Sequence, residues 1–382
     1  MAKTKSRANG DGDVFPRKNK AGKITSYRGA YVGPDGKRRY VSGKNKAEAR
    51  AKLRKARGDA ERGLVFDADN LKVGEYLDRW LADSVSDTVK ATTFERYEQI
   101  ARLHLKPAFG WMKVKALTPA HVRGLYRKKL ESGSSARTVR YIHTTLHKAL
   151  KQAVMDGLIP RNVTETVKPP QPSREEMCPL TPEQAKLLLQ VVHEAGDRLE
   201  ALYVLAIHTG LRQGELLGLK WDDVDLEDGS LQVRRTLTMT KDGPVFTSPK
   251  TTGSRRSVKL TSKAIEALKR HLERQLGEID KVGPLWSENG LIFASETGEP
   301  LDRRAVTKLK FKPLLKRAGL PEVRFHDLRH TCATLLLTRN VNPKIVSEML
   351  GHSTIAITLD TYSHVLPNMR DQAAAAMEEA LS

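Results

Sequence analysis

The residue types best suited to chemistry lie in the second half of the chain: Arg212, Lys250, His326, Arg329, His352 and Tyr362. Three cations can hold a phosphate group, two imidazoles can move protons, and the phenol can act as a nucleophile. This inventory predicts phosphoryl transfer on a nucleic acid through a covalent tyrosyl intermediate. The chemistry needs no carboxylate base, and we expect neither a metal nor another cofactor.

The spacing of these residues supports the same chemistry. His326 and Arg329 are three positions apart, so a helix that begins there places both on one face. Arg212 and Glu215 have the same spacing, which lets the carboxylate brace the guanidinium. Two guanidiniums can bind the two non-bridging oxygens of a phosphodiester, and they stabilise the charge that grows in the transition state. Lys250 is expected in a turn between two strands, from which its ammonium reaches a leaving oxygen.

Other kinds of site are disfavoured by the same segments. His326 and His330 are four residues apart like a metal-binding pair, but no Glu follows the first His, so zinc is not expected. The segment 351–355 differs from the serine-hydrolase elbow at its last position. No phosphate-binding P-loop sequence is present, so ATP is not implied.

The charge of the chain favours a polyanionic partner. It has 66 Lys and Arg residues against 45 Asp and Glu, a net charge of +21 and a pI near 9.9. Residues 1–66 hold 19 basic and 6 acidic residues, so most of the excess lies there. Nucleic acid is the leading candidate partner, and the basic segment predicts a separate DNA-contacting module. A solvated basic tail is the alternative for that segment.

Length and cysteine content set the class of protein. The 382 residues should form two or three domains, and Cys178 and Cys332 are too few for a disulfide framework, which fits a reducing cytoplasm. The first residues lack the apolar core of a signal peptide. No apolar run approaches the roughly 20 residues that span a bilayer, so we expect no membrane role.

The N-terminal segment predicts a small α+β domain. Residues 1–12 are polar and are expected to be disordered. Strands at 27–32 and 37–41 flank a turn sequence, and Asn45 can cap a helix over 46–62. Such a sheet could lie in a DNA major groove, with these candidate contacts: Arg28, Lys37, Arg38 and Arg39.

Residues 71–160 read as an all-helical domain with apolar stripes at helical spacing, including a helix over 135–156. Its polar faces carry three candidate DNA contacts, each equally well explained as a solvated side chain: Arg96, Arg137 and Arg140. A proline-rich linker follows. Beyond it we expect a mixed, mainly helical domain with helices near 181–194, 197–208, 212–219, 262–277, 302–318, 326–338, 343–350 and 354–363, and strands at 230–238, 244–249 and 255–260. A further helix is expected over 372–381.

Three segments taken together are more specific than any residue alone: 209–216 (TGLRQGEL), 326–331 (HDLRHT) and 350–353 (LGHS) followed by Thr361-Tyr362. In this order and spacing the chain closely resembles the tyrosine recombinase, or phage integrase, family over about residues 70–366. The three-module layout resembles the arm-binding integrases of phages and conjugative transposons. Their N-terminal domain binds arm-type DNA sites through a three-stranded sheet, while the helical and catalytic domains clamp the core site.

The resemblance implies roles for the individual residues. Tyr362 would attack the scissile phosphate, form a 3′-phosphotyrosyl bond and free a 5′-hydroxyl. Arg212, Arg329 and His326 would stabilise the phosphorane, with His326 also helping to move the tyrosine proton. Lys250 would protonate the leaving oxygen, and His352 would donate a hydrogen bond to a phosphate oxygen. One departure is Cys332, which stands where the family often has an aromatic residue.

The resemblance also implies an organisation and partners. We expect an arm-binding domain over 1–66, a helical core-binding domain over 67–167, a linker over 168–177, a catalytic domain over 178–366 and a tail over 367–382. The expected partners are double-stranded DNA with core and arm sites, three further copies of the chain, and an excision factor or host DNA-bending protein, in a bacterial cytoplasm at the nucleoid. Two alternatives remain open: a dimer-resolving recombinase like the Xer proteins, and a non-catalytic architectural DNA-binding protein.

Overall fold

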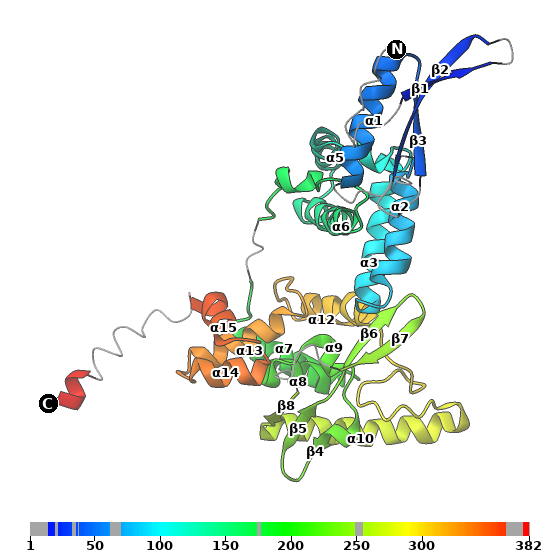
Figure 1. Ribbon diagram of the computed structural model, residues 1–382. Helices are drawn as coiled ribbons and strands as arrows, with labels where there is room; N and C mark the ends of the chain where they lie inside the picture. Colours follow the sequence, from blue (N-terminus) through cyan, green and yellow to red (C-terminus); the bar gives the residue numbers. More distant parts are fainter. Residues whose placement is uncertain are drawn as a thin grey trace. The chain divides into compact units, whose positions relative to one another are not determined.

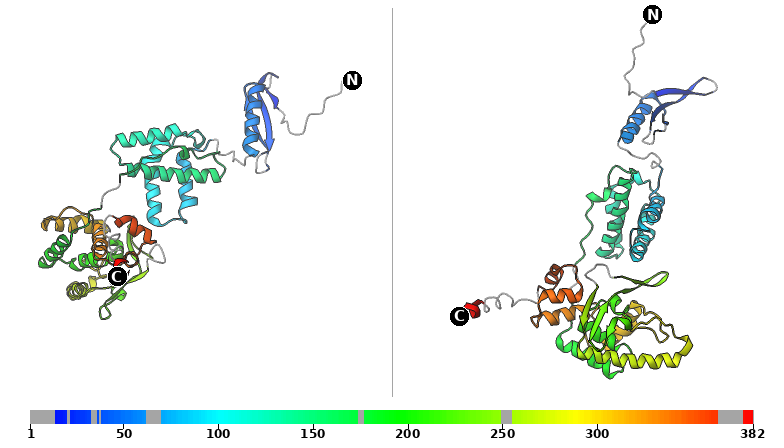
Figure 2. Two further views of the ribbon diagram at one scale, coloured as in Figure 1. Left: turned by 90° about the vertical axis from the view of Figure 1, so that its left-hand side faces the viewer. Right: turned by 60° about the horizontal axis from the view of Figure 1, so that its bottom comes forward.

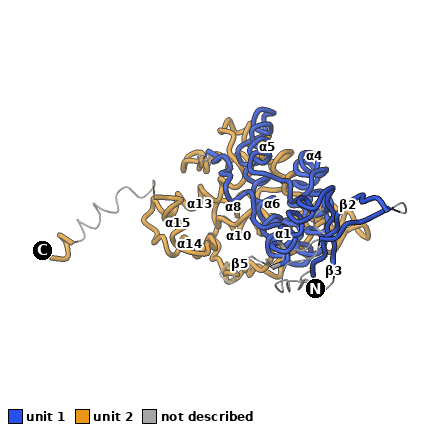
Figure 3. Tube along the Cα trace, turned by 45° about the horizontal axis from the view of Figure 1, so that its top comes forward, with its two compact units in different colours: residues 1–174 blue, residues 175–382 orange. Residues whose placement is uncertain are grey.

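The computed structural model describes residues 14–19, 22–32, 36, 38–61, 70–173, 177–248, 255–363 and 377–381. The chain divides into two compact units, Met1–Arg174 and Glu175–Ser382 (Figure 3). Lys37, Lys250, the segment predicted to be disordered and the first half of the predicted C-terminal helix, residues 372–376, lie outside the described residues. Within the described residues, no helix is both long and apolar enough to cross a membrane.

The first unit begins with a small antiparallel sheet and one helix. The strands β1 (Val14–Lys18), β2 (Ile24–Val32) and β3 (Arg38–Gly43) pair in that order, and α1 (Lys46–Glu61) lies along one face of the sheet (Figures 1 and 2). Asn45 caps the helix, since its Oδ1 accepts a 2.8 Å bond from the Glu48 amide. Leu53 and Ala56 of α1 pack on Tyr31 of β2. The predicted hairpin strands and helix are confirmed, whereas β1 was not identified from its own residues.

The rest of the first unit is helical, as the apolar stripes predicted. Its helices are α2 (Val73–Arg79), α3 (Ala91–Ile100), α4 (Lys106–Phe109), α5 (Pro119–Glu131) and α6 (Ala136–Met155). They share a core of their own, in which Leu77, Leu105, Ile142 and Leu146 are fully buried. Wider π-helical turns at Trp80–Val85 and Ala101–Leu105 extend α2 and join α3 to α4.

The second unit is built around one buried helix. α8 (Glu200–Thr209) is buried along nearly its whole length, and it contacts α7 (Pro182–Glu194), α10 (Ser262–Val282) and α13 (Asp327–Leu337). The remaining helices are α9 (Gln213–Leu216), α11 (Arg303–Ala305), α12 (Lys312–Arg317), α14 (Pro343–Leu350) and α15 (Ile355–Tyr362). A π-helical stretch, Val306–Phe311, joins α11 to α12, so the helix predicted over 302–318 is continuous but not regular.

The strands of the second unit form two small sheets. One contains β4 (Val224–Asp225), β5 (Ser230–Val233) and β8 (Arg256–Lys259), and the other is the hairpin of β6 (Thr236–Thr240) and β7 (Gly243–Thr247). The single strand predicted over 230–238 is therefore wrong. The first sheet ends at Val233 and the second begins at Thr236. The two residues between these strands, Arg234 and Arg235, both form ion pairs with the buried Asp223.

Candidate active site

The start of α13 supplies a buried guanidinium. Arg329 is 3% exposed, and its Nη1 donates to the carbonyls of Gly210 at 2.8 Å and Leu350 at 2.7 Å. Its Nη2 is buried and has no hydrogen-bond partner among the described residues. Burial, and then the neighbouring cation Arg212, lower the pKa of Arg329 to about 10. A buried donor without a partner is costly, so this nitrogen is suited to an anion that enters the site.

Arg212 lies beside it at the N-terminus of α9. Its Nη1 forms an ion pair with Glu215 Oε1 at 2.7 Å, and its backbone amide donates to Oε2 of the same carboxylate at 3.0 Å. The brace predicted from the three-residue spacing is therefore present. Burial alone would raise the pKa of Glu215, but the guanidiniums of Arg256 and Arg212 hold it below its ordinary value. The carboxylate stays charged and keeps the Arg212 fork in one orientation.

The C-terminal end of α14 anchors three guanidiniums. The last carbonyls of a helix have no partner within it, and they carry the negative end of the helix dipole. Here three successive carbonyls each bind a different arginine: Met349 accepts from Arg256 Nε at 2.6 Å, Leu350 from Arg329 Nη1 at 2.7 Å, and Gly351 from Arg212 Nη2 at 3.2 Å. The three cations are thereby gathered around one backbone segment, directly before His352.

Tyr362 is the last residue of α15, and its side chain packs against α13 and α14. Its ring packs in a small core with Ala333, Val346 and Leu350, and it is 1% exposed. Its hydroxyl lies 2.8 Å from Nδ1 of His330. Burial raises the pKa of Tyr362 to about 12, although the charge of Arg329 acts in the opposite direction. In this state the phenol is protonated and covered.

Three imidazoles surround the arginines. The rings of His326 and His330 meet edge to face with centroids 5.0 Å apart, and His352 Nδ1 lies 2.7 Å from Thr358 Oγ1 on α15. Burial, followed by neighbouring charges, lowers the pKa of both His330 and His352 to about 4. The pKa of His326 is lowered for the same reasons, although this residue is exposed. The depressed pKa values mean that His330 and His352 are uncharged at neutral pH.

Comparison with known proteins identifies the family that has this arrangement of arginines, histidines and a tyrosine. The model of the phage integrase family matches residues 179–369, and the N-terminal SAM-like domain of phage integrases matches residues 72–130. A tyrosine recombinase XerC-like protein of Caldanaerobacter subterraneus is 34% identical, covering 88% of this chain and 90% of the relative. The chain belongs to the phage integrase family. It is a tyrosine recombinase, an enzyme that breaks and rejoins DNA at specific sites.

Further relatives of the recombinase extend over most of its length. An integrase of Streptomyces ambofaciens is 32% identical, covering 95% of this chain and 94% of the relative. Among solved structures, the Tn1549 transposon integrase bound to circular intermediate DNA has a TM-score of 0.67 at 23% identity, covering 81% of this chain and 99% of that one. A lambda integrase tetramer on a Holliday junction has a TM-score of 0.58 at 21% identity, covering 93% and 96%. These structures share the fold.

Five of the six catalytic residues predicted for the recombinase lie in the described part, and contacts within the second unit link them. Lys250 lies outside the described residues. Two further residues of the site were not predicted. His330 stands in a recognised motif but had been weighed only as a metal ligand, and Arg256 had no motif at all. Among the described residues, no three His, Cys, Asp or Glu side chains come together as a metal site.

The predicted DNA contacts of the helical domain are exposed side chains of α3 and α6. The guanidinium carbon of Arg96 on α3 lies 4.8 Å from the ring centre of Tyr141 on α6. Arg137 and Arg140 precede Tyr141 by four and one residues, and all of these side chains are exposed. Helical spacing places them on one side of α6. The group is a basic surface with an aromatic centre.

The candidate DNA contacts of the N-terminal sheet lie on two different faces of that sheet. Arg28 stacks on Tyr40, with its guanidinium carbon 4.0 Å from the ring centre, and Arg38 lies 5.9 Å from the same ring. Arg39 pairs with Tyr31, whose side chain packs under α1. Because side chains alternate along a strand, Arg28 and Arg38 belong to the open face and Arg39 to the covered one.

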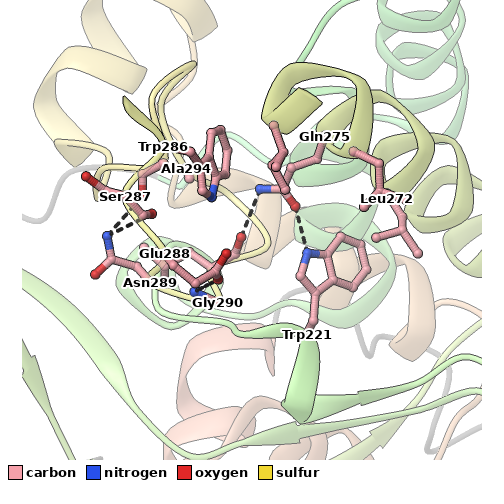
Figure 4. Close-up of a pocket in the computed structure, with 13 residues that line it drawn as sticks. Trp221, Leu272, Gln275, Trp286, Ser287, Glu288, Asn289, Gly290 and Ala294 are labelled. Carbon is pink, nitrogen blue, oxygen red and sulfur yellow. Dashed lines mark hydrogen bonds between the residues drawn. The ribbon is translucent and has the colours of Figure 1, made fainter. Parts of the chain in front are cut away.

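A separate hollow of about 190 Å³ in the second unit is lined by the indoles of Trp221 and Trp286 (Figure 4). Trp221 Nε1 donates to Gln275 Oε1 at 2.7 Å, and Gln275 Nε2 donates to the Leu291 carbonyl at 3.0 Å. None of the described catalytic candidates lines it. The Trp221 indole and the Gln275 amide are satisfied within the protein, which suits packing better than catalysis.

Proposed function

We propose that this recombinase cuts DNA by attack of Tyr362 on a backbone phosphate. The phenol oxygen forms a bond to phosphorus, the bond to the 5′ oxygen breaks, and a 3′-phosphotyrosyl intermediate remains with a free 5′-hydroxyl. That hydroxyl, or one from a partner strand, reverses the step. The observation that supports the site most strongly is the buried Nη2 of Arg329 beside Arg212: it has no hydrogen-bond partner among the described residues, and a phosphate oxygen would satisfy it.

The electrostatics suit this assignment. Arg212, Arg256 and Arg329 bring three positive charges and Glu215 one negative charge, so the cluster attracts an anion. In the proposed roles, Arg212 and Arg329 hold the non-bridging oxygens, and His352 and His326 donate hydrogen bonds to the developing phosphorane. Lys250 protonates the leaving oxygen. His330, which contacts the Tyr362 hydroxyl, lies between that hydroxyl and His326.

The burial of Tyr362 adds one requirement. A phosphate cannot reach a hydroxyl that is 1% exposed and bonded to His330, so cleavage requires the hydroxyl to leave this position when DNA is bound. The tyrosine belongs to a small cluster contributed by α13, α14 and α15, and a movement of α15 away from α13 and α14 would uncover it. Such a state would hold the nucleophile inactive away from DNA.

The substrate and assembly follow from the family. We propose that the enzyme integrates and excises a mobile element in the bacterial cytoplasm, that residues 1–66 bind arm sites, and that residues 67–167 and 178–366 clamp the core site. The linker 168–177 and the tail 367–382 complete this organisation. Four copies would act on two duplexes, as the lambda integrase tetramer on a Holliday junction suggests. An excision factor or host DNA-bending protein would set the direction.

The test is covalent capture of DNA. The full chain is incubated in EDTA with a nicked duplex taken from the joined ends of the element that encodes it, and the adduct is separated by denaturing electrophoresis. We expect an adduct with wild type and none with Tyr362→Phe, while DNA binding persists. Tyr203→Phe is the matched control, since Tyr203 is a fully buried tyrosine of the same unit whose hydroxyl has no partner among the described residues. A metal requirement, or an unchanged adduct in Tyr362→Phe, would overturn the proposal.

A further inference from the structure

Arg256 is a buried cation that neither the motifs nor the chemistry of the site called for. It lies at the start of β8, and its side chain is 7% exposed. Its Nη2 pairs with Glu215 Oε2 at 3.0 Å, and its Nε donates to the Met349 carbonyl at 2.6 Å. It also packs closely on Gly351, where an added Cβ would lie 2.8 Å from Arg256 Nη1. The guanidinium therefore contacts two segments of the site that are distant in sequence.

The first of these contacts acts on Arg212. The two oxygens of Glu215 are divided between partners: Oε1 binds the side chain of Arg212, and Oε2 binds Arg256 together with the Arg212 backbone amide. Arg256 thus prevents the carboxylate from rotating. Since Arg212 takes its orientation from that carboxylate, a free Glu215 would leave the phosphate-binding fork less well fixed.

The second contact acts on the end of α14. The carbonyl of Met349 is held by Arg256, and the next two carbonyls are held by Arg329 and Arg212. His352 follows this segment directly. A shift of the helix end would therefore displace two guanidiniums and an imidazole together.

We propose that Arg256 is a positioning residue for phosphoryl transfer, which fixes Glu215 and the C-terminal end of α14 and through them orients Arg212 and His352. This inference rests on the proposed function. Arginine is suited to the role because its planar fork binds a carboxylate and a carbonyl in two fixed directions at once. A lysine at this position carries the same charge but binds as a single point, so it would hold one of the two partners.

The test measures single-turnover cleavage of the nicked duplex at saturating enzyme by wild type, Arg256→Ala and Arg256→Lys. We expect Arg256→Ala to cleave about 100-fold more slowly, because a misplaced catalytic group costs about that factor. Arg256→Lys should recover only part of the rate, and DNA affinity should change by no more than a few-fold. Should Arg256→Ala fail to fold, the comparison rests on Arg256→Lys, for which a wild-type rate would overturn the inference.

Arg198 provides a matched control in the same unit. Its guanidinium also binds one carboxylate, Glu278, and backbone carbonyls, those of Ala294 and Ser295, and its side chain is 22% exposed against 7% for Arg256. Arg198→Ala should also lower thermal stability but should cleave at the wild-type rate. Equal rate losses in the two variants would show that Arg256 acts through stability alone, and would overturn the inference.

A double-mutant cycle gives the decisive measurement. If Arg256 acts through Arg212, then the variant lacking both arginines should cleave no more slowly than Arg212→Ala, within about three-fold. Multiplied losses would contradict the inference. Wild type and Tyr362→Phe are measured on the same duplex, so the two kinds of failure can be told apart. If wild type forms no adduct, the proposed function fails. If Arg256→Ala cleaves at the wild-type rate, only this inference fails.

Discussion

The hydroxyl of Tyr362 and Nδ1 of His330 lie 2.8 Å apart, at the buried end of α15. The pKa of the phenol is raised to about 12 and that of the imidazole is lowered to about 4, in both cases mainly by burial. The phenol therefore keeps its proton and lies beside a neutral imidazole. The pair is a neutral hydrogen bond, and it would keep the proposed nucleophile unreactive in this state.

This hydrogen bond predicts a specific pattern of stability. His330→Ala leaves the Tyr362 hydroxyl buried without a partner, which should lower the free energy of unfolding by about 1–3 kcal/mol. The double variant His330→Ala/Tyr362→Phe removes both partners and should be less destabilised than the sum of the two single variants. Urea denaturation of the four proteins measures the coupling. Strictly additive losses would show that the bond contributes nothing to stability.

The end of α14 predicts an unequal response of two glycines. Gly351 has φ = 67°, and an added Cβ would lie 2.8 Å from Arg256 Nη1; Gly319 has φ = 64° and nothing within 4 Å of its Cβ position. Both alanine variants pay the cost of a left-handed residue, about 1–2 kcal/mol. Only Gly351→Ala must also displace the guanidinium, so we expect it to lose more stability and to cleave DNA more slowly. Equal effects in denaturation and cleavage assays would exclude the contact with Arg256 as their cause.

The two depressed histidine pKa values predict a loss of stability in acid. Above the ordinary histidine pKa of about 6.5, His330 and His352 are neutral in both the folded and the unfolded chain. Between about 6.5 and 4 the unfolded chain takes up protons that the folded chain does not, because both folded pKa values are about 4. The free energy of unfolding should therefore fall as the pH is lowered through this range. Denaturation of His330→Asn and His352→Asn should show a shallower pH dependence than wild type, and an unchanged slope would contradict the assignment.

The residues of the site differ in how far the sequence could predict them. The pairs Arg212–Glu215 and His326–Arg329 act within single helical turns, so their spacing was enough. Arg256 reaches Glu215 and Met349 across 41 and 93 positions, and only the folded chain brings these together. The contact of His330 with Tyr362, 32 residues later, was invisible for the same reason.

The secondary structure was also predicted well where its cause is local in the sequence, and poorly where residues far along the chain are involved. The cap at Asn45 was predicted correctly, because its side chain accepts a bond from an amide three residues on, and Thr118 and Thr181 cap their helices in the same way. The strand predicted over 230–238 is two strands, because the alternation of Leu231, Val233 and Leu237 is interrupted at Arg235. Arg234 and Arg235 pair there with Asp223, a residue outside the strand.

If residues 1–66 bind arm-site DNA, as proposed, the N-terminal sheet predicts which of their arginines contact it. Arg38 lies on the open face near Tyr40, whereas Arg39 lies on the face that α1 covers. Each phosphate contact releases counterions, so losing one lowers the slope of log affinity against log salt by about 0.9. Arg38→Ala should lower the slope by about this amount, and Arg39→Ala should change it less. Fluorescence anisotropy with an arm-site duplex at several salt concentrations measures the slope for both variants. Deletion of residues 1–66 should lower the slope further than either variant and should spare core-site cleavage.

A slope that falls equally in Arg38→Ala and Arg39→Ala would mean that the open face of the sheet is not the DNA-binding surface.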